Sequence, residues 1–224
     1  MSRNGGRVGA AEGPAAIRQA LASLAVHTDA PLYDAGTVTV AGTHRGLHQG
    51  LDDVPAIINL DAHFDLRTAD IPTSGTPFRQ IADLVGDEFC YSVLGISVPN
   101  NSRTLFHAPS QLNVHVSTDE ELVDLSPAEC AAIAVGCARS HEAIHLSIDL
   151  DVLPAGTAPG VSAPAALGVE MAKIHAIVSA LAETGKLRLV DVVELNPRLD
   201  IDDRTAKVAA RLVSAISHRA SQFS

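Results

Sequence analysis

The chain has 224 residues, 46% of them apolar, which is enough to bury one substantial core, so we expect a single domain over residues 1–224. Its formal net charge is -10 with 16 basic residues, and aromatic residues make up 3% of the chain. These values argue against a nucleic-acid surface and mildly against an anionic membrane as partner.

The thiols and the N-terminal residues indicate a cytoplasmic protein. Cys90, Cys130 and Cys137 form no Cys-x-x-Cys pair, so free thiols in a reducing compartment are the expected state. Residues 1–7 are polar, and no apolar run approaches the roughly 18 residues that a membrane-spanning helix needs. We therefore expect neither a signal peptide nor a membrane anchor.

Helices and strands are predicted to alternate along the chain. Pro14 and Pro127 are typical of first helical turns, and short β-branched segments bounded by Pro or Gly are typical of strands. The elements, in chain order, are a helix at 15–24, a strand at 37–40, a short helix or loop at 42–51, a strand at 54–60, a helix at 78–85, a strand at 89–96, a short helix that 99–102 caps and that runs through 106, a strand at 112–116, a helix at 126–138, a strand at 143–148, a helix at 169–183, a strand at 186–193 and a helix at 203–217. This pattern predicts an α/β fold with a mostly parallel sheet covered on both faces.

The strand at 54–60 runs into Asp61, His63 and Asp65, which are spaced i, i+2 and i+4. Side chains at that spacing along a strand point to one side, so the three can converge where the strand ends. The carboxyl ends of parallel strands are also where α/β proteins bind ligands. Two carboxylates and an imidazole suit Mn²⁺ or Zn²⁺, whereas the alternative interpretation is a polar turn with a capping Asp.

Two further strands also end in acids. The strand at 143–148 leads into Asp149 and Asp151, which a loop rich in Pro, Gly and Ala follows, and the strand at 186–193 leads into Glu194. If such strand ends meet, their buried carboxylates need a counter-charge, and a pair of metal ions would supply it. Capping residues, and a surface acid in the case of Glu194, are the alternative interpretation.

These segments resemble the ureohydrolase family, which includes arginase and agmatinase. The matching words are Asp-Ala-His-Phe-Asp at 61–65, Ser-Ile-Asp-Leu-Asp at 147–151 and Glu-Leu-Asn-Pro at 194–197. Ser-Gly-Thr-Pro-Phe at 74–78 and Ala-Pro-Gly-Val-Ser-Ala-Pro at 158–164 are similar to the formimidoylglutamase branch of that family. The resemblance covers nearly the whole chain and implies an arginase-like, three-layer α/β/α fold.

The resemblance also implies a site for two manganese ions. The residues carried over as metal ligands are Asp61, His63, Asp65, Asp149 and Asp151, with Asp61 and Asp149 bridging the two ions. The family supplies one more histidine from a Gly-rich word before the first acidic strand, and this chain has no such word there. We therefore expect a fold truncated relative to the family, one incomplete metal site, and His44 as the candidate substitute ligand.

The activity that the resemblance implies is hydrolysis of N-formimidoyl-L-glutamate to L-glutamate and formamide in histidine degradation, by a hydroxide that bridges the metals. Asp65 would hold this hydroxide and pass its proton to the departing amine, and Glu194 would bind the cationic amidinium. Arg67 would clamp a substrate carboxylate, with Ser74 as the weaker candidate, although an Arg beside acids is also typical of a structural ion pair. The partner would be a small molecule, and the family's rings imply a homo-oligomer.

Two alternatives to an active formimidoylglutamase stay open. The first is an impaired remnant that binds one metal ion or serves as an oligomer subunit, which the altered first motif favours. The second is an arginase-like or agmatinase-like enzyme that acts on a guanidino compound. Arg67 and Phe78 count against the second, because arginases carry a neutral residue and a histidine at those two places.

Overall fold

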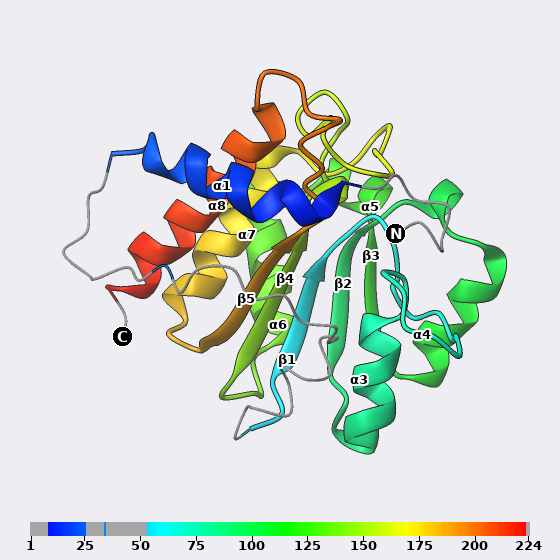
Figure 1. Cartoon of the computed structure of the whole chain (residues 1–224). Helices are drawn as coiled ribbons and strands as arrows, with labels where there is room; N and C mark the ends of the chain where they lie inside the picture. The colour runs from blue at the N-terminus through cyan, green and yellow to red at the C-terminus, as the bar shows by residue number, and fades with distance from the viewer. Residues whose placement is uncertain (1–8, 26–33, 35–52, 223–224) are drawn as a thin grey trace.

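The protein is described by a computed structural model that covers residues 9–25, 34 and 53–222. Its centre is a sheet of five strands in the order β3-β2-β1-β4-β5, and every neighbouring pair is parallel (Figure 1). The strands are β1 (Ala56–Leu60), β2 (Tyr91–Ile96), β3 (His115–Thr118), β4 (Ile144–Asp149) and β5 (Leu187–Val193). The carboxyl ends of all five strands therefore lie along one edge of the sheet.

Helices cover both faces of this sheet (Figure 1). The helices are α1 (Gly13–Ala22), α3 (Pro77–Val85), α4 (Ala108–Gln111), α5 (Asp119–Val123), α6 (Pro127–Cys137), α7 (Met171–Glu183) and α8 (Arg204–Ala220). The larger core joins Ile58 and Leu146 to apolar side chains of α6, α7 and α8. The smaller core joins Ile57 and Val93 to Phe78 and other apolar side chains of α3. The predicted three-layer α/β/α fold is thus confirmed.

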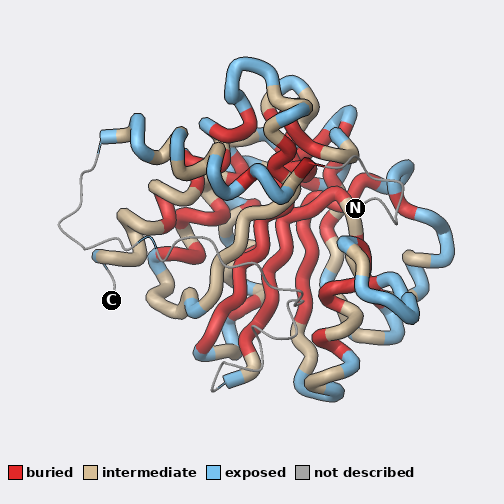
Figure 2. Tube along the Cα trace, in the orientation of Figure 1, coloured by how far each residue is buried: buried red, intermediate tan, exposed pale blue. Residues whose placement is uncertain are grey.

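The middle of the sheet is the most deeply buried part of the molecule. Every residue of β1, β2 and β4 is buried, and β5 is mostly of intermediate exposure (Figure 2). Burial on both faces explains why β1 is apolar at every position except Asn59 rather than alternating between apolar and polar residues. Among the described residues, no helix has the length and apolar character needed to cross a membrane.

One predicted strand is misplaced. The sequence favours a strand at 112–116, but Asn113 has a φ of 52°, so the extended conformation begins only at His115.

Thr118 then caps α5 by accepting a hydrogen bond from the backbone N–H of Glu121, whose side chain accepts one from the backbone N–H of Thr118 in return. This capping box is a recognised signal for a helix start, and the short helix was not predicted. The predicted elements at 37–40 and 42–51 lie outside the described residues.

Asp200 caps the start of α8. Its carboxylate accepts hydrogen bonds from the backbone N–H groups of Thr205 and Ala206, at 2.9 and 3.0 Å, in the first turn of α8. Thr205 Oγ1 also donates to it and in turn accepts the N–H of Gly160, so this contact joins the helix to the loop that follows β4.

We expect Asp200→Ala to lower the free energy of unfolding by about 1–2 kcal/mol, as the loss of a helix N-terminal cap does. Thermal and urea unfolding would measure this loss. Asp70→Ala, which removes an exposed loop carboxylate, serves as the control and should change the stability little. Equal stability of the two variants would contradict a capping role for Asp200.

Candidate metal centre

The register of the central strands brings the acidic strand ends together. Leu60 of β1 pairs with Ile148 of β4, so the next residues, Asp61 and Asp149, leave the sheet at the same level of adjacent strands. Both side chains are buried. The negative charge of Asp61 is among the causes that raise the pKa of Asp149, as expected for neighbouring carboxylates.

The turn after β1 is shaped by hydrogen bonds rather than by strand alternation, which corrects the predicted reason for convergence. The strand ends at Leu60, and the backbone N–H of His63 donates to Asp61 Oδ1 at 2.6 Å. The N–H of Ala62 donates to Asp151 Oδ1 at 3.2 Å and ties the turn to the end of β4. Asp65 then takes a φ of 51°, a left-handed conformation that is uncommon for residues other than Gly, Asn and Asp.

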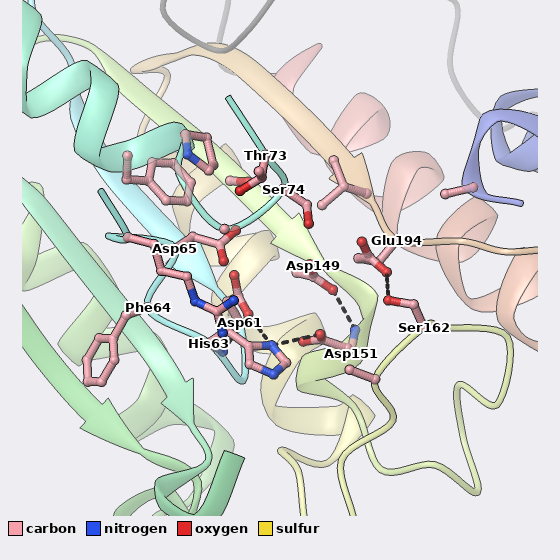
Figure 3. Close-up of a pocket in the computed structure, with 18 of the residues that line it drawn as sticks. Asp61, His63, Phe64, Asp65, Thr73, Ser74, Asp149, Asp151, Ser162 and Glu194 are labelled. Carbon is pink, nitrogen blue, oxygen red and sulfur yellow. Dashed lines mark hydrogen bonds and ion pairs between the residues drawn. The ribbon is translucent and has the colours of Figure 1, made fainter. Parts of the chain in front are cut away.

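Three of the predicted ligands lie within reach of one cation (Figure 3). His63 Nδ1 is 3.0 Å from Asp151 Oδ2 and 3.5 Å from Asp61 Oδ1. One ligand atom from each of Asp61, His63 and Asp151 can be chosen so that all lie within 4.8 Å of one another. Asp149 adjoins this group, because its Oδ1 accepts the N–H of Asp151 at 2.8 Å.

The electrostatics show a site crowded with carboxylates. Burial, followed by the negative charge of Asp151, raises the pKa of Asp61 from 3.8 to about 6. Burial also raises the pKa of Asp65 and Asp149 well above their usual range, and neighbouring carboxylates add to both shifts. Burial alone would lower the pKa of His63, but its contacts with Asp151 and Asp61 outweigh this and raise it to about 11.

This donor set fits a divalent metal ion. Carboxylate oxygens and an imidazole nitrogen are ligands for hard and borderline cations, and repulsion between neighbouring carboxylates adds to burial in raising the pKa of Asp61, Asp65 and Asp149. Buried carboxylates that repel one another are costly unless a cation compensates them. The structure therefore supports a metal cofactor at this edge of the sheet. The predicted substitute ligand His44 lies outside the described residues.

Glu194 stands on the opposite rim, directly after β5 (Figure 3). Its backbone is left-handed, with a φ of 72°, and its Oε2 accepts a hydrogen bond from Ser162 Oγ at 2.7 Å. Burial raises the pKa of Glu194, although the Ser162 hydrogen bond lowers it in part. Ser162 was not predicted as a site residue, and its place in the matching loop word at 158–164 was the only sequence signal for it.

A pocket of about 740 Å³ opens above these groups. Its lining includes Asp65, Glu194 and the two predicted substrate contacts, Arg67 and Ser74, and one wall comes from α1. Arg67 and Ser74 are exposed, and the loop that carries Ser74 is closed by a hydrogen bond from Arg67 N–H to the carbonyl of Gly75 at 2.9 Å. All eight predicted site residues therefore line one cavity.

The parallel sheet, its covering helices and the Asp/His cluster at the carboxyl ends of its central strands define an α/β protein with a candidate metal site. The model of the Arginase family matches residues 37–218, and the chain belongs to this family. The crystal structure of Trypanosoma cruzi formiminoglutamase with Mn²⁺ superimposes with a TM-score of 0.86 and 23% identity, covering 97% of this chain and 88% of that one. This likeness confirms the arginase-like fold.

Curated relatives point to one branch of the family. The formimidoylglutamase of Corynebacterium efficiens is 48% identical over 250 aligned positions, which cover 96% of this chain and 80% of that protein. The formimidoylglutamase of Nocardia farcinica is 42% identical, with 98% of this chain and 83% of that protein covered. The predicted resemblance to the ureohydrolase family, and to its formimidoylglutamase branch, is confirmed.

Proposed function

We propose that this protein hydrolyses N-formimidoyl-L-glutamate to L-glutamate and formamide at a site for two Mn²⁺ ions. The observation that carries the proposal is the grouping of Asp61, His63 and Asp151 beside Asp149, on the rim of a pocket that also contains Glu194 and Arg67. The relatives named above support the substrate, and they favour it over a guanidino compound.

The metal ligands in this proposal are Asp61, His63, Asp65, Asp149 and Asp151. The ions, when bound, would supply the Lewis-acid chemistry that generates hydroxide from water near neutral pH. The buried, mutually repelling carboxylates support the binding of a divalent cation here.

The remaining steps fall to side chains of the pocket. Water adds to the formimidoyl carbon, the bond from that carbon to the glutamate nitrogen breaks, and formamide leaves. Asp65 takes the proton from the attacking water and delivers it to the glutamate nitrogen. Glu194 binds the planar amidinium through its carboxylate, which also accepts the hydrogen bond from Ser162 Oγ. Arg67, with Ser74, binds a carboxylate of the glutamate portion.

The direct test is to load the full chain with Mn²⁺ and to measure formamide and glutamate released from N-formimidoyl-L-glutamate. Equal amounts of the two products, with L-arginine and agmatine turned over far more slowly, are the expected result. One bound Mn²⁺ ion without formamide release would support the inactive remnant instead. We also propose that residues 1–224 form one domain that acts in the cytoplasm as a homo-oligomer; the three free thiols support that compartment.

For Arg67→Met we expect KM for N-formimidoyl-L-glutamate to rise about 10-fold to 100-fold, because a charged hydrogen-bonding partner of a carboxylate is lost. Affinity for Mn²⁺ should not change, since Arg67 is exposed and is not one of the proposed metal ligands. Steady-state kinetics and Mn²⁺ titration measure the two effects. Arg103→Met, at an exposed arginine outside the pocket lining, is the control. An unchanged KM would assign Arg67 a structural role only.

A further inference from the structure

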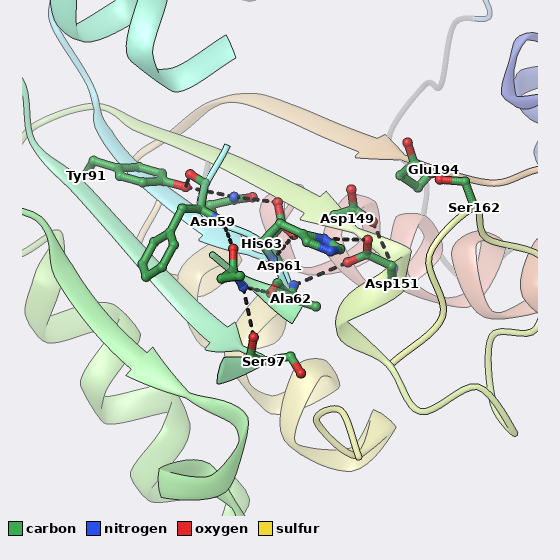
Figure 4. Close-up of polar contacts among 12 residues, drawn as sticks. Asn59, Asp61, Ala62, His63, Tyr91, Ser97, Asp149, Asp151, Ser162 and Glu194 are labelled. Atoms are coloured by element: carbon green, nitrogen blue, oxygen red, sulfur yellow. Dashed lines mark hydrogen bonds and ion pairs between the residues drawn. The ribbon is translucent and has the colours of Figure 1, made fainter. Parts of the chain in front are cut away.

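A chain of buried polar side chains lies directly behind the candidate metal ligands (Figure 4). Asn59 Nδ2 donates to Asp61 Oδ2 at 3.0 Å and to the hydroxyl of Tyr91 at 2.9 Å. The Tyr91 hydroxyl donates in turn to the backbone carbonyl of Phe64 at 3.1 Å. Asn59 lies on β1 and Tyr91 on β2, so two central strands support the turn from behind.

The donors and acceptors in this chain allow only one arrangement. The Asp61 carboxylate and the Phe64 carbonyl can only accept, so the amide nitrogen of Asn59 must face Asp61 and the Tyr91 hydroxyl must donate to Phe64. The hydroxyl oxygen then accepts the second N–H of Asn59. Burial, with the charge of Asp61, raises the pKa of Tyr91 well above its usual range, which keeps this donor protonated. Stacking of Tyr91 on Phe78, with ring centroids 4.7 Å apart, fixes the ring itself.

These contacts determine how Asp61 presents its two oxygens. Oδ1 accepts the backbone N–H of His63 and also lies 3.5 Å from His63 Nδ1, whereas Oδ2 accepts the N–H of Asn59. A carboxylate oxygen has two acceptor sites, so Oδ2, which has one hydrogen bond, can also contact a cation. The Asp61 carboxylate is thus held from both sides, and these contacts set its orientation on the pocket wall.

We infer that Asn59, fixed by Tyr91, is a positioning residue that orients the Asp61 carboxylate for metal binding. The inference rests on the proposed metal site and goes beyond it, because it assigns a role to two residues that contact neither metal nor substrate. Partners that orient metal ligands in this way contribute strongly to metal affinity.

The test compares Mn²⁺ binding by the full chain with binding by Asn59→Leu and Tyr91→Phe. Asn59→Leu keeps the branched shape of the side chain and removes both hydrogen bonds, and we expect about 10-fold to 100-fold weaker Mn²⁺ binding. Tyr91→Phe leaves Asn59 in place without its second partner, and we expect a smaller loss of about 3-fold to 10-fold. Ser179→Ala, which removes a buried hydroxyl on α7, is the matched control and should bind like the wild-type chain.

Thermal unfolding of each metal-free variant separates positioning from folding, because a merely structural role would lower the melting temperature and leave the Kd of Mn²⁺ unchanged. Wild-type affinity in a folded Asn59→Leu variant would overturn the inference and leave the proposed function standing. If Asn59→Leu does not fold, Tyr91→Phe decides, and wild-type affinity there would overturn the inference. A wild-type chain that binds no Mn²⁺ would overturn the proposed function, and this inference with it.

Discussion

Asp149→Asn will abolish activity and weaken Mn²⁺ binding by at least about 1,000-fold, yet it will make the metal-free protein more stable. The loss of binding follows because an amide replaces a buried carboxylate ligand that the proposed site shares between both ions. The gain in stability follows because burial and the charges of Asp151 and Asp61 disfavour the ionised form of Asp149 in the folded state. Asn keeps an oxygen that can accept the N–H of Asp151.

The pH dependence of the free energy of unfolding shows why Asp149→Asn should stabilise the metal-free chain. The pKa of Asp61 is raised from 3.8 to about 6 in the folded chain, so ionisation of this cluster costs stability as pH rises from about 4 through 6. The raised pKa of His63 adds stability below about 6.5 that is lost as pH rises toward 11, which is the same direction. The metal-free wild-type chain should therefore be more stable at pH 5 than at pH 8, and Asp149→Asn should reduce that difference.

Urea unfolding in the presence of a chelator, at pH 5 and pH 8, measures this difference. At pH 8 we expect Asp149→Asn to exceed the wild-type chain by about 1–3 kcal/mol, the amount that removal of an uncompensated buried charge provides. Asp124→Asn, at an exposed acid after α5, is the control for loss of one negative charge. A metal-free Asp149→Asn chain less stable than the wild-type chain at pH 8 would show that the carboxylates are not mutually repulsive.

The acids of the site could be predicted from the sequence because they follow strands within short, recognisable words. Their exact convergence could not, since it depends on conformations that local propensity does not specify. Asp65 and Glu194 both have left-handed backbones, and nothing in their residue type required this. Such strain in non-glycine residues is common at functional sites, where the surrounding structure imposes it.

The residues that hold the metal ligands and Glu194 in place were harder to predict, because their hydrogen-bond partners lie far away in the sequence. Asn59 and Tyr91 are 32 residues apart, as are Ser162 and Glu194. Strand pairing brings the first pair together, and the fold of the loop after β4 brings Ser162 to Glu194. Only one feature of Asn59 was visible beforehand: it is a polar residue inside an apolar strand, two positions before Asp61. A buried amide in a central strand requires hydrogen-bond partners, so that exception to the apolar pattern was the available signal.

The fold itself followed from the alternation of apolar strands with helices, and the error at Asn113 shows the limit of that reasoning. Residues 112–116 have the apolar content of a strand, and a single left-handed residue delays it by three positions. Sequence patterns therefore identified the elements better than their boundaries. The boundary matters less for function here, because β3 lies at the edge of the sheet and the ligands follow β1 and β4.

Glu194→Gln should lower kcat/KM for N-formimidoyl-L-glutamate by about 100-fold to 1,000-fold, while Mn²⁺ affinity stays within about 3-fold of wild type. Gln keeps the size of the side chain and an oxygen for the hydroxyl of Ser162, but it cannot neutralise a cationic amidinium. Since the amidinium is the reacting group, the loss should fall on kcat as well as on KM, unlike the KM effect expected for Arg67→Met.

Ser162→Ala provides the graded control for this prediction. It leaves the charge of Glu194 and removes only the hydrogen bond to Oε2, so a loss of about 3-fold to 10-fold in kcat/KM is expected. Joint loss of Mn²⁺ affinity and activity in Glu194→Gln would instead make Glu194 a metal ligand. Glu194 follows β5, whereas the proposed ligands follow β1 and β4. A loss of kcat/KM in Glu194→Gln without a loss of Mn²⁺ affinity would therefore show that substrate recognition and metal binding depend on different residues of one pocket.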